Sequence, residues 1–241
     1  MPKNLPSEGK TAAAFTAVVA LFFLNDLAFI EADSLGQWLA ADYAFKVAAL
    51  ELILFLAPLR RAAADQKLTL LLTETTLLVL VAGAFVISVF EIAYPLIDEA
   101  LPETALQEMP EIRSASVCWL NMTFGLALTA IAEELVFRRL FYSVLRPFFT
   151  SSALFVLASA VLFGLIHWSG GVANVVSATI AGIALRVLML RTGSVLPAIV
   201  AHYLINFVLF FDPPYALGGL GYSAGTGAGC SDSIAPRLRA M

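Results

Sequence analysis

Apolar residues run along this chain in long blocks, without the alternation of apolar and polar positions that half-buried strands show. A membrane-spanning helix needs about 20 mainly apolar residues. The blocks predict seven such spans, at residues 12–30, 43–59, 68–90, 117–145, 152–167, 172–190 and 195–211. We therefore expect an all-α fold, a polytopic transmembrane helix bundle of about seven spans.

The separators between the blocks predict how the spans connect. Residues 60–67 and 98–113 are rich in charge and are typical of loops outside the membrane. Residues 168–171 and 191–194 leave room only for tight turns. Short connections of this kind join antiparallel neighbours, so the last spans are expected to pack against one another.

No boundary divides the chain, so residues 1–241 are expected to form a single membrane domain. The first spans, within residues 12–111, offer no residues to which a role can be assigned. The candidate chemistry falls among the last four spans, in residues 117–211. The glycine-rich tail at 212–241 has little apolar surface to bury and is expected to be disordered.

Composition supports a membrane protein. Hydrophobic residues make up 60% of the chain and charged residues 13%, with a mean hydropathy of +0.88. Soluble domains contain roughly 45–50% apolar and roughly 25% charged residues. The net charge of −4 gives no reason to expect a nucleic-acid partner. Cys118 and Cys230 have no metal-binding spacing, and we expect no disulfide between them.

Basic residues orient the bundle, because cytoplasmic loops carry an excess of lysine and arginine. If the N-terminus is cytoplasmic and the first span is uncleaved, that side receives ten of the fourteen basic residues. These ten are Lys3, Lys10, Arg60, Arg61, Lys67, Arg138, Arg139, Arg146, Arg186 and Arg191. Short loops and spans rich in alanine and leucine are typical of the bacterial cytoplasmic membrane.

Two adjacent acids stand inside the fourth predicted span. Placing an ionisable side chain at the centre of a bilayer costs at least ~2.5–3.5 kcal/mol, so such a residue indicates function. On a helix, Glu134 and Arg138 can pair across one turn, whereas Glu133 points about 100° away and stays available for chemistry. Alternatively, the cluster simply ends the span, with its charged groups extending into the headgroups.

The only two histidines of the chain lie in the same group of spans. His167 follows Phe163 by four residues at the end of one span. His202 lies within the last span, with Asn206 one turn further along the same face. Either histidine could be an ordinary core residue. Together with the acids, however, neutral imidazoles can shuttle a proton, and an amide can donate a hydrogen bond to an oxyanion.

Other polar residues within the predicted spans have structural interpretations. Six of them are expected to face the interior and to form hydrogen bonds between helices. They are Asn25, Asp26, Glu51, Glu74, Glu91 and Asn121. A face of small residues is expected to let two helices pack closely. It comprises Ser177, Ala178, Ala181 and Gly182.

Three motifs on three separate spans resemble one family. They are Glu133-Glu134-x-x-x-Arg138, Phe163-x-x-x-His167 and His202-x-x-x-Asn206. In order and spacing they are similar to the signature motifs of the CAAX-protease and bacteriocin-processing (CPBP or Abi) family. Its members are glutamic-type intramembrane endopeptidases. The resemblance covers about residues 117–211.

The resemblance implies a role for each motif residue. Glu133 would activate water, and Glu134 with Arg138 would position it or bind the polar end of the substrate. His167 would share in the activation of water, and His202 with Asn206 would hold the oxyanion. Phe163 would pack against the site.

The residues alone leave several chemistries open. A zinc hydrolase could use His167, His202 and Glu133 as ligands, although a glutamate-activated water needs no cofactor. A haem-binding electron carrier could use His167 and His202 as axial ligands. A proton-coupled transporter could use the buried acids as a relay. For the endopeptidase, which we favour, the partners are the lipid bilayer and a membrane-associated or exported protein or peptide substrate.

Overall fold

In the computed structural model of the protein, residues 5–64, 74–101, 105–106, 112 and 114–211 are described. Every regular element in these ranges is a helix, which confirms the all-α prediction. The first half contains α1 (Leu5–Ile30), α2 (Leu35–Phe55), α3 (Ala57–Ala64), α4 (Glu74–Ser88), η1 (Val89–Ala93) and α5 (Tyr94–Ala100). Next come α6 (Ala115–Leu120), η2 (Asn121–Gly125), α7 (Leu126–Glu134), η3 (Leu135–Leu140), α8 (Phe141–Leu145) and η4 (Arg146–Phe148). The last are α9 (Ser152–Leu165), η5 (Trp168–Gly170), α10 (Gly171–Thr192) and α11 (Leu196–Phe211).

Four helical stretches are long and apolar enough to cross a membrane. They are Gly9–Ile30, Glu74–Ala100, Ala115–Phe148 and Trp168–Thr192. Ser152–Leu165 and Leu196–Phe210 are shorter apolar helices. The predicted second span lies largely in α2, which carries three charged residues, Asp42, Lys46 and Glu51. The protein is thus an integral membrane protein by helix length and composition, but the predicted number of seven spans is not confirmed.

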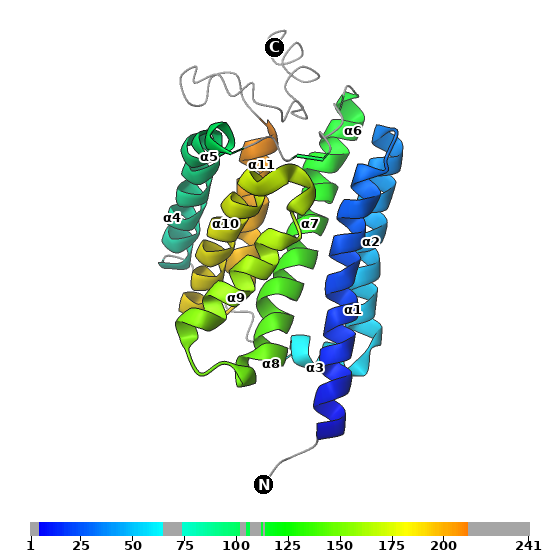
Figure 1. Ribbon diagram of the computed structural model, residues 1–241, viewed down its shortest axis with the longest axis vertical. Coiled ribbons are helices and arrows are strands. Elements are labelled where there is room, and N and C mark those ends of the chain that lie inside the picture. Colours follow the sequence, from blue (N-terminus) through cyan, green and yellow to red (C-terminus); the bar gives the residue numbers. More distant parts are fainter. Residues whose placement is uncertain (1–4, 65–73, 102–104, 107–111, 113, 212–241) are drawn as a thin grey trace.

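The helices form one bundle in which successive long helices run in opposite directions (Figure 1). α1 and α2 pack together on one side, and α4 with α5 lies on the other. The stretch Ala115–Phe148 descends between them, and α9, α10 and α11 fill the centre. α11 contacts both α4 and α7, and α1 contacts η3 and η5. The predicted tail at 212–241 lies outside the described residues.

The backbones of α9 and α10 approach closely because small residues lie between them. A Cβ added at Gly164 would be 2.6 Å from the carbonyl oxygen of Val175, and one at Gly182 would be 3.1 Å from Cα of Ala160. Neither glycine could carry a side chain without a shift of the neighbouring helix. The predicted face of small residues, all buried or nearly so, is therefore confirmed as a packing surface.

Two of the interior polar residues behave as predicted. The side-chain amide of Asn25 donates a hydrogen bond to Asp42 at 3.2 Å, which joins α1 to α2. The hydroxyl of Tyr43 donates to Asn121 at 3.0 Å, which joins α2 to η2. Such bonds satisfy polar groups that lipid could not solvate.

Three other predictions are wrong. Glu51 is exposed, because it lies on the face of α2 opposite to its buried residues. Glu74 is exposed because it occupies the first turn of α4, at a helix end. Cys118 does not remain a free thiol and is disulfide-bonded. The only other cysteine, Cys230, lies outside the described residues.

Candidate active site

The two acids close α7 near the middle of the central stretch Ala115–Phe148. Glu133 is 6% exposed and Glu134 is fully buried. The helix changes from α to π geometry immediately after them, because η3 begins at Leu135. π-helical turns are rare and often occur at functional sites. Two buried carboxylates beside such a turn must be compensated by nearby groups.

Glu134 is held from two sides. Its Oε2 lies 3.1 Å from Nε of Arg138, and both side chains are fully buried. Its Oε1 accepts a hydrogen bond from Nδ1 of His202 at 3.0 Å. The predicted pair across one turn of the helix is present, with an imidazole from α11 added to it. The contact with Arg138 is an ion pair and the contact with His202 is a hydrogen bond to a carboxylate, so Glu134 is held in orientation by both.

His202 bridges the two acids. With its Nδ1–H donated to Glu134, its Nε2 faces Oε2 of Glu133 at 3.8 Å. That separation is too long for a hydrogen bond. Among the described residues, Oε2 of Glu133 has no hydrogen-bond partner although it is buried. Glu133 and Nε2 of His202 are therefore the groups of this cluster whose lone pairs remain available.

Phe163 is the common neighbour of both histidines. Its ring meets the imidazole of His167 edge to face at a centroid distance of 4.9 Å, and that of His202 at 5.9 Å. The guanidinium carbon of Arg138 lies 4.4 Å from the centre of the same ring. Phe163 thus sets the spacing between the histidine at the end of α9 and the groups on η3 and α11.

His167 has a defined tautomer. Its Nδ1–H donates to the backbone carbonyl of Phe163 at 2.9 Å, which leaves Nε2 as a proton acceptor. The ring is half-buried, whereas that of His202 is buried. His167 can therefore accept a proton from a bound water or substrate.

The short length of α9 brings His167 to the depth of the acids. With 14 residues, α9 extends only about 21 Å, less than the ~30 Å hydrocarbon core. The chain then turns through η5, and α10 begins at Gly171, whose φ of +85° favours glycine. The turn after His167 consequently lies within the bundle instead of at its surface.

Asn206 is the motif residue that these contacts do not include. It lies one turn after His202 on α11 and is half-buried. Its side chain forms no hydrogen bond with the described residues. The structure thus brings together Glu133, Glu134, Arg138, Phe163, His167 and His202, and places Asn206 at their border.

Asp26 of α1 also reaches this site, which sequence reasoning missed. Its Oδ2 accepts a hydrogen bond from the backbone N–H of Ser169, two residues after His167, at 3.0 Å. It is also close enough to His167 and Glu133 to interact with them electrostatically. The signal in the sequence was an acid in the middle of an otherwise apolar first span, for which we had expected only a structural hydrogen bond.

Three of the arginines counted on the cytoplasmic side are buried in the bundle. Arg138 and Arg186 are fully buried and Arg139 is 4% exposed. Arg186 donates to the carbonyls of Phe137 and Arg138 at 2.5 and 2.7 Å. The basic residues that support a cytoplasmic N-terminus are therefore fewer than the sequence suggested.

The zinc and haem alternatives find no matching arrangement in the described part of the chain. There, no three His, Cys, Asp or Glu side chains are grouped so that they could bind a metal ion. For haem, Nδ1 of His202 is engaged by Glu134, and both imidazoles pack against Phe163.

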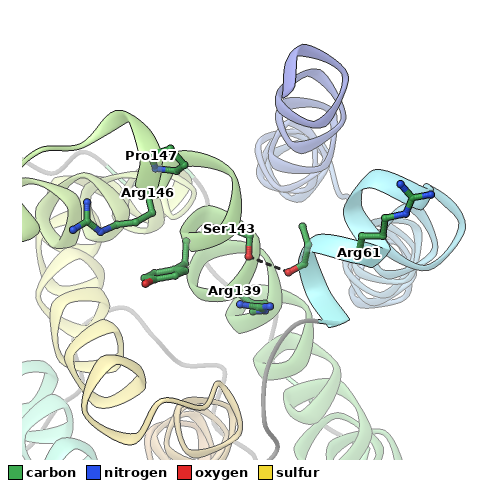
Figure 2. A pocket seen from close by; sticks show the side chains of 7 residues that line it. Arg61, Arg139, Ser143, Arg146 and Pro147 are labelled. Carbon is green, nitrogen blue, oxygen red and sulfur yellow. Dashed lines mark hydrogen bonds between the residues drawn. The ribbon is translucent and has the colours of Figure 1, made fainter. Parts of the chain in front are cut away.

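A separate cavity of about 400 Å³ lies between α3 and α8, near the end of the bundle where α1 begins (Figure 2). Its lining includes Arg61, Arg139, Arg146 and Ser143, the last of which donates to the carbonyl of Ala62 at 2.9 Å. None of the predicted catalytic residues lines it. The guanidinium groups of Arg61 and Arg146 point apart in Figure 2, so they do not converge on a common ligand.

Comparison with known proteins gives one match. Residues 115–208 match the family described as type II CAAX prenyl endopeptidase Rce1-like. No curated protein and no solved structure matches the chain. The matched segment contains all three motifs and both histidines, so the resemblance identified from the motifs is confirmed over this segment. Asp26, which belongs to α1, lies outside it.

Proposed function

We propose that this protein is an intramembrane endopeptidase that hydrolyses a peptide bond with a glutamate-activated water. The observation that carries the proposal is His202, whose two nitrogens face two buried glutamates, one of them anchored by Arg138. The match of the surrounding segment to the CAAX endopeptidase family supports the choice of peptide hydrolysis over other proton-transfer chemistry.

Glu133 is the general base in this mechanism. It is buried, it has a carboxylate oxygen with no partner among the described residues, and it faces an imidazole nitrogen. It takes a proton from water as the water oxygen attacks the substrate carbonyl. The same proton then passes to the leaving amine, which restores the carboxylate. His167, with Nε2 available, helps to orient the attacking water.

His202 and Asn206 stabilise the oxyanion. His202 lies between two carboxylates, so its Nε2 can hold the proton that Glu133 takes from water while the tetrahedral intermediate exists, before this proton passes to the leaving amine. Its Nε2–H can then donate to the oxyanion, and the Asn206 amide, one turn away, can supply a second donor. A site inside the bundle excludes bulk water, so each of these interactions is stronger than it would be in solution.

The substrate is a membrane-associated or exported protein or peptide, because the scissile bond must reach groups within the bilayer. The short helices α9, which ends just before His167, and α11, which bears His202, would let a substrate segment and water approach the site from a membrane face. The remaining charge distribution favours an N-terminus in the cytoplasm, and the short loops favour a bacterial cytoplasmic membrane.

Substrate trapping tests the proposal. Glu133→Gln keeps the shape of the side chain and removes its basicity, so native membranes containing this variant should accumulate an uncleaved protein that wild type processes. Mass spectrometry of proteins captured by the variant identifies that substrate, and the purified pair then gives the cleavage site.

Glu91→Gln is the matched control, because Glu91 is an acid in an apolar stretch with a π-helical turn but is far from the histidines along the chain. Equal capture by both variants, or a captured protein that wild type does not cut, would contradict the proposal. Flux of a small solute without any cleavage would favour the transporter.

A further inference from the structure

The six residues after Glu134 form η3, and the carbonyls of two of them are bound by side chains of other helices. A π-helical turn shifts the regular ladder of backbone hydrogen bonds, so its carbonyls are free to accept from elsewhere. The carbonyl of Phe137 accepts from Ser159 at 2.8 Å and from Arg186 at 2.5 Å. The carbonyl of Arg138 accepts from Arg186 at 2.7 Å. α9 and α10 thus hold this turn from outside.

Arg186 is the centre of this network. Its guanidinium also donates to the hydroxyl of Ser159, at 3.1 Å from Nε and 2.6 Å from Nη2. The side chain is fully buried and forms no ion pair with a described residue at contact distance. Its neighbours are backbone carbonyls, one hydroxyl and the faces of Phe141 and Phe155, at 5.5 and 5.1 Å.

A neutral side chain could have tied down these carbonyls, as Ser159 does for one of them. Burying a full charge without a direct counter-ion is costly. A nearby charge explains why a cation is buried here. Arg186 interacts electrostatically with Glu134, whose direct partners are Arg138 and His202. Arg138, on the helix of the acids, and Arg186, behind it, thus place two fully buried guanidiniums near the carboxylates.

We propose that Arg186 is a positioning residue for the glutamate pair. It fixes η3 in its π geometry, so that Arg138 meets Glu134 and Glu133 stays directed at His202, and it supplies the second positive charge that the pair requires. This inference rests on the proposed hydrolytic function. None of the three motifs includes Arg186, and it touches neither the glutamates nor the histidines directly.

Three variants of Arg186 and one matched control test this role. Arg186→Gln keeps hydrogen-bond donors and loses the charge, Arg186→Lys keeps the charge and loses the planar fork, and Arg186→Met loses both. Arg191→Gln is the control, because Arg191 lies on the same helix, in its last turn, and is exposed. We expect kcat to fall roughly tenfold or more for Arg186→Gln and further for Arg186→Met, at nearly unchanged KM. Arg186→Lys should recover part of the loss.

A second readout needs no substrate. The chain has two histidines, so 15N-histidine labelling of the full protein in lipid nanodiscs yields only two imidazoles. The His202→Asn variant assigns them. Arg186→Gln should shift the signals of His202, because it loosens the partner of its Nδ1–H, and Arg191→Gln should leave both imidazoles as in wild type.

Unchanged His202 signals in Arg186→Gln would overturn the positioning role, as would a loss of kcat that merely follows the fraction of folded protein. If wild type cleaves nothing, the proposed function fails, and the imidazole signals still decide whether Arg186 positions the pair.

Discussion

Two apolar stretches of this protein contain a π-helical turn with an acid in or beside it, and they differ in how far they are buried among other helices. The most apolar 18-residue window of Glu74–Ala100 has a mean hydropathy of 2.4, and only 17% of that window is buried inside the protein. The corresponding window of Ala115–Phe148 has a mean hydropathy of 1.5, and 44% of it is buried. In the first, Glu91 is half-buried within η1. In the second, two acids precede η3 and are buried among helices.

The difference shows which surroundings an acid beside a π-helical turn needs before it can take part in chemistry. In Glu74–Ala100 large side chains such as Leu77, Leu80 and Ile92 are exposed, as expected of a face in contact with lipid. In Ala115–Phe148 the turn is contacted by α1, α3 and α9, and side chains of α9 and α10 donate hydrogen bonds to its carbonyls. The acids become chemically useful only where other helices surround them.

The largest expected difference between the two stretches comes from replacing one glutamate in each of them by alanine. Glu133→Ala should lower kcat by roughly 10²–10⁴, since a general base contributes about that much, while the protein still inserts and accumulates. Glu91→Ala should leave cleavage close to wild type. Cleavage rates per folded protein in membranes measure both. If Glu133→Ala remains active and Glu134→Ala is dead, the two glutamates have their roles exchanged.

The histidine pair should show nearly as large a loss. His167→Ala and His202→Ala should each be severely impaired, and the double variant should be no worse than the poorer single one. Residues that act as one catalytic unit are not additive, and Phe163 already joins these two physically. Single-turnover rates of all three variants give the comparison. Losses that multiply in the double variant would mean that the histidines act independently.

A smaller effect is expected from Asp26, through which the N-terminal part of the chain contributes to the site. Asp26→Ala removes both the charge and the acceptor for the N–H of Ser169, and should cost roughly tenfold in kcat. Asp26→Asn keeps an acceptor and should lose less. Asn25→Ala is the control, because Asn25 forms one interhelical bond with Asp42, away from the histidines. Equal rates for the variants of Asp26 and Asn25 would reduce Asp26 to a structural residue.

The smallest expected effect is that of metal removal. A water activated by Glu133 needs no ion, so cleavage by purified protein should survive strong chelation within experimental error. The measurement is the initial rate before and after dialysis against chelator, with zinc added back. A loss that zinc restores would favour a metal-dependent hydrolase and would change the role of both histidines.

The amino-acid sequence determined the helical class and the membrane environment, since long apolar blocks can satisfy their backbone in lipid only as helices. It also determined which residues of the last spans are unusual, because an ionisable group in an apolar block is costly wherever it lies. The pairing of Glu134 with Arg138 followed from helix geometry alone, as the two residues are one turn apart.

Only the tertiary structure decided which separate helices share a site. The pattern of residues within one helix does not say how far along the bundle axis a neighbouring helix is shifted. The placement of His202 between Glu133 and Glu134 therefore depends on how α11 packs on α7. Asp26 and Arg186 are distant from the motifs in the chain, and the packing of α1 and α10 brings them to Ser169 and η3. The predicted number of seven spans is not confirmed, and α2 contains charged residues that are paired or exposed within the bundle. A contact between residues distant in the chain forms only when the whole fold offsets the entropy lost on closing the intervening loop. An apolar block or a pair one helical turn apart depends only on a few neighbouring residues.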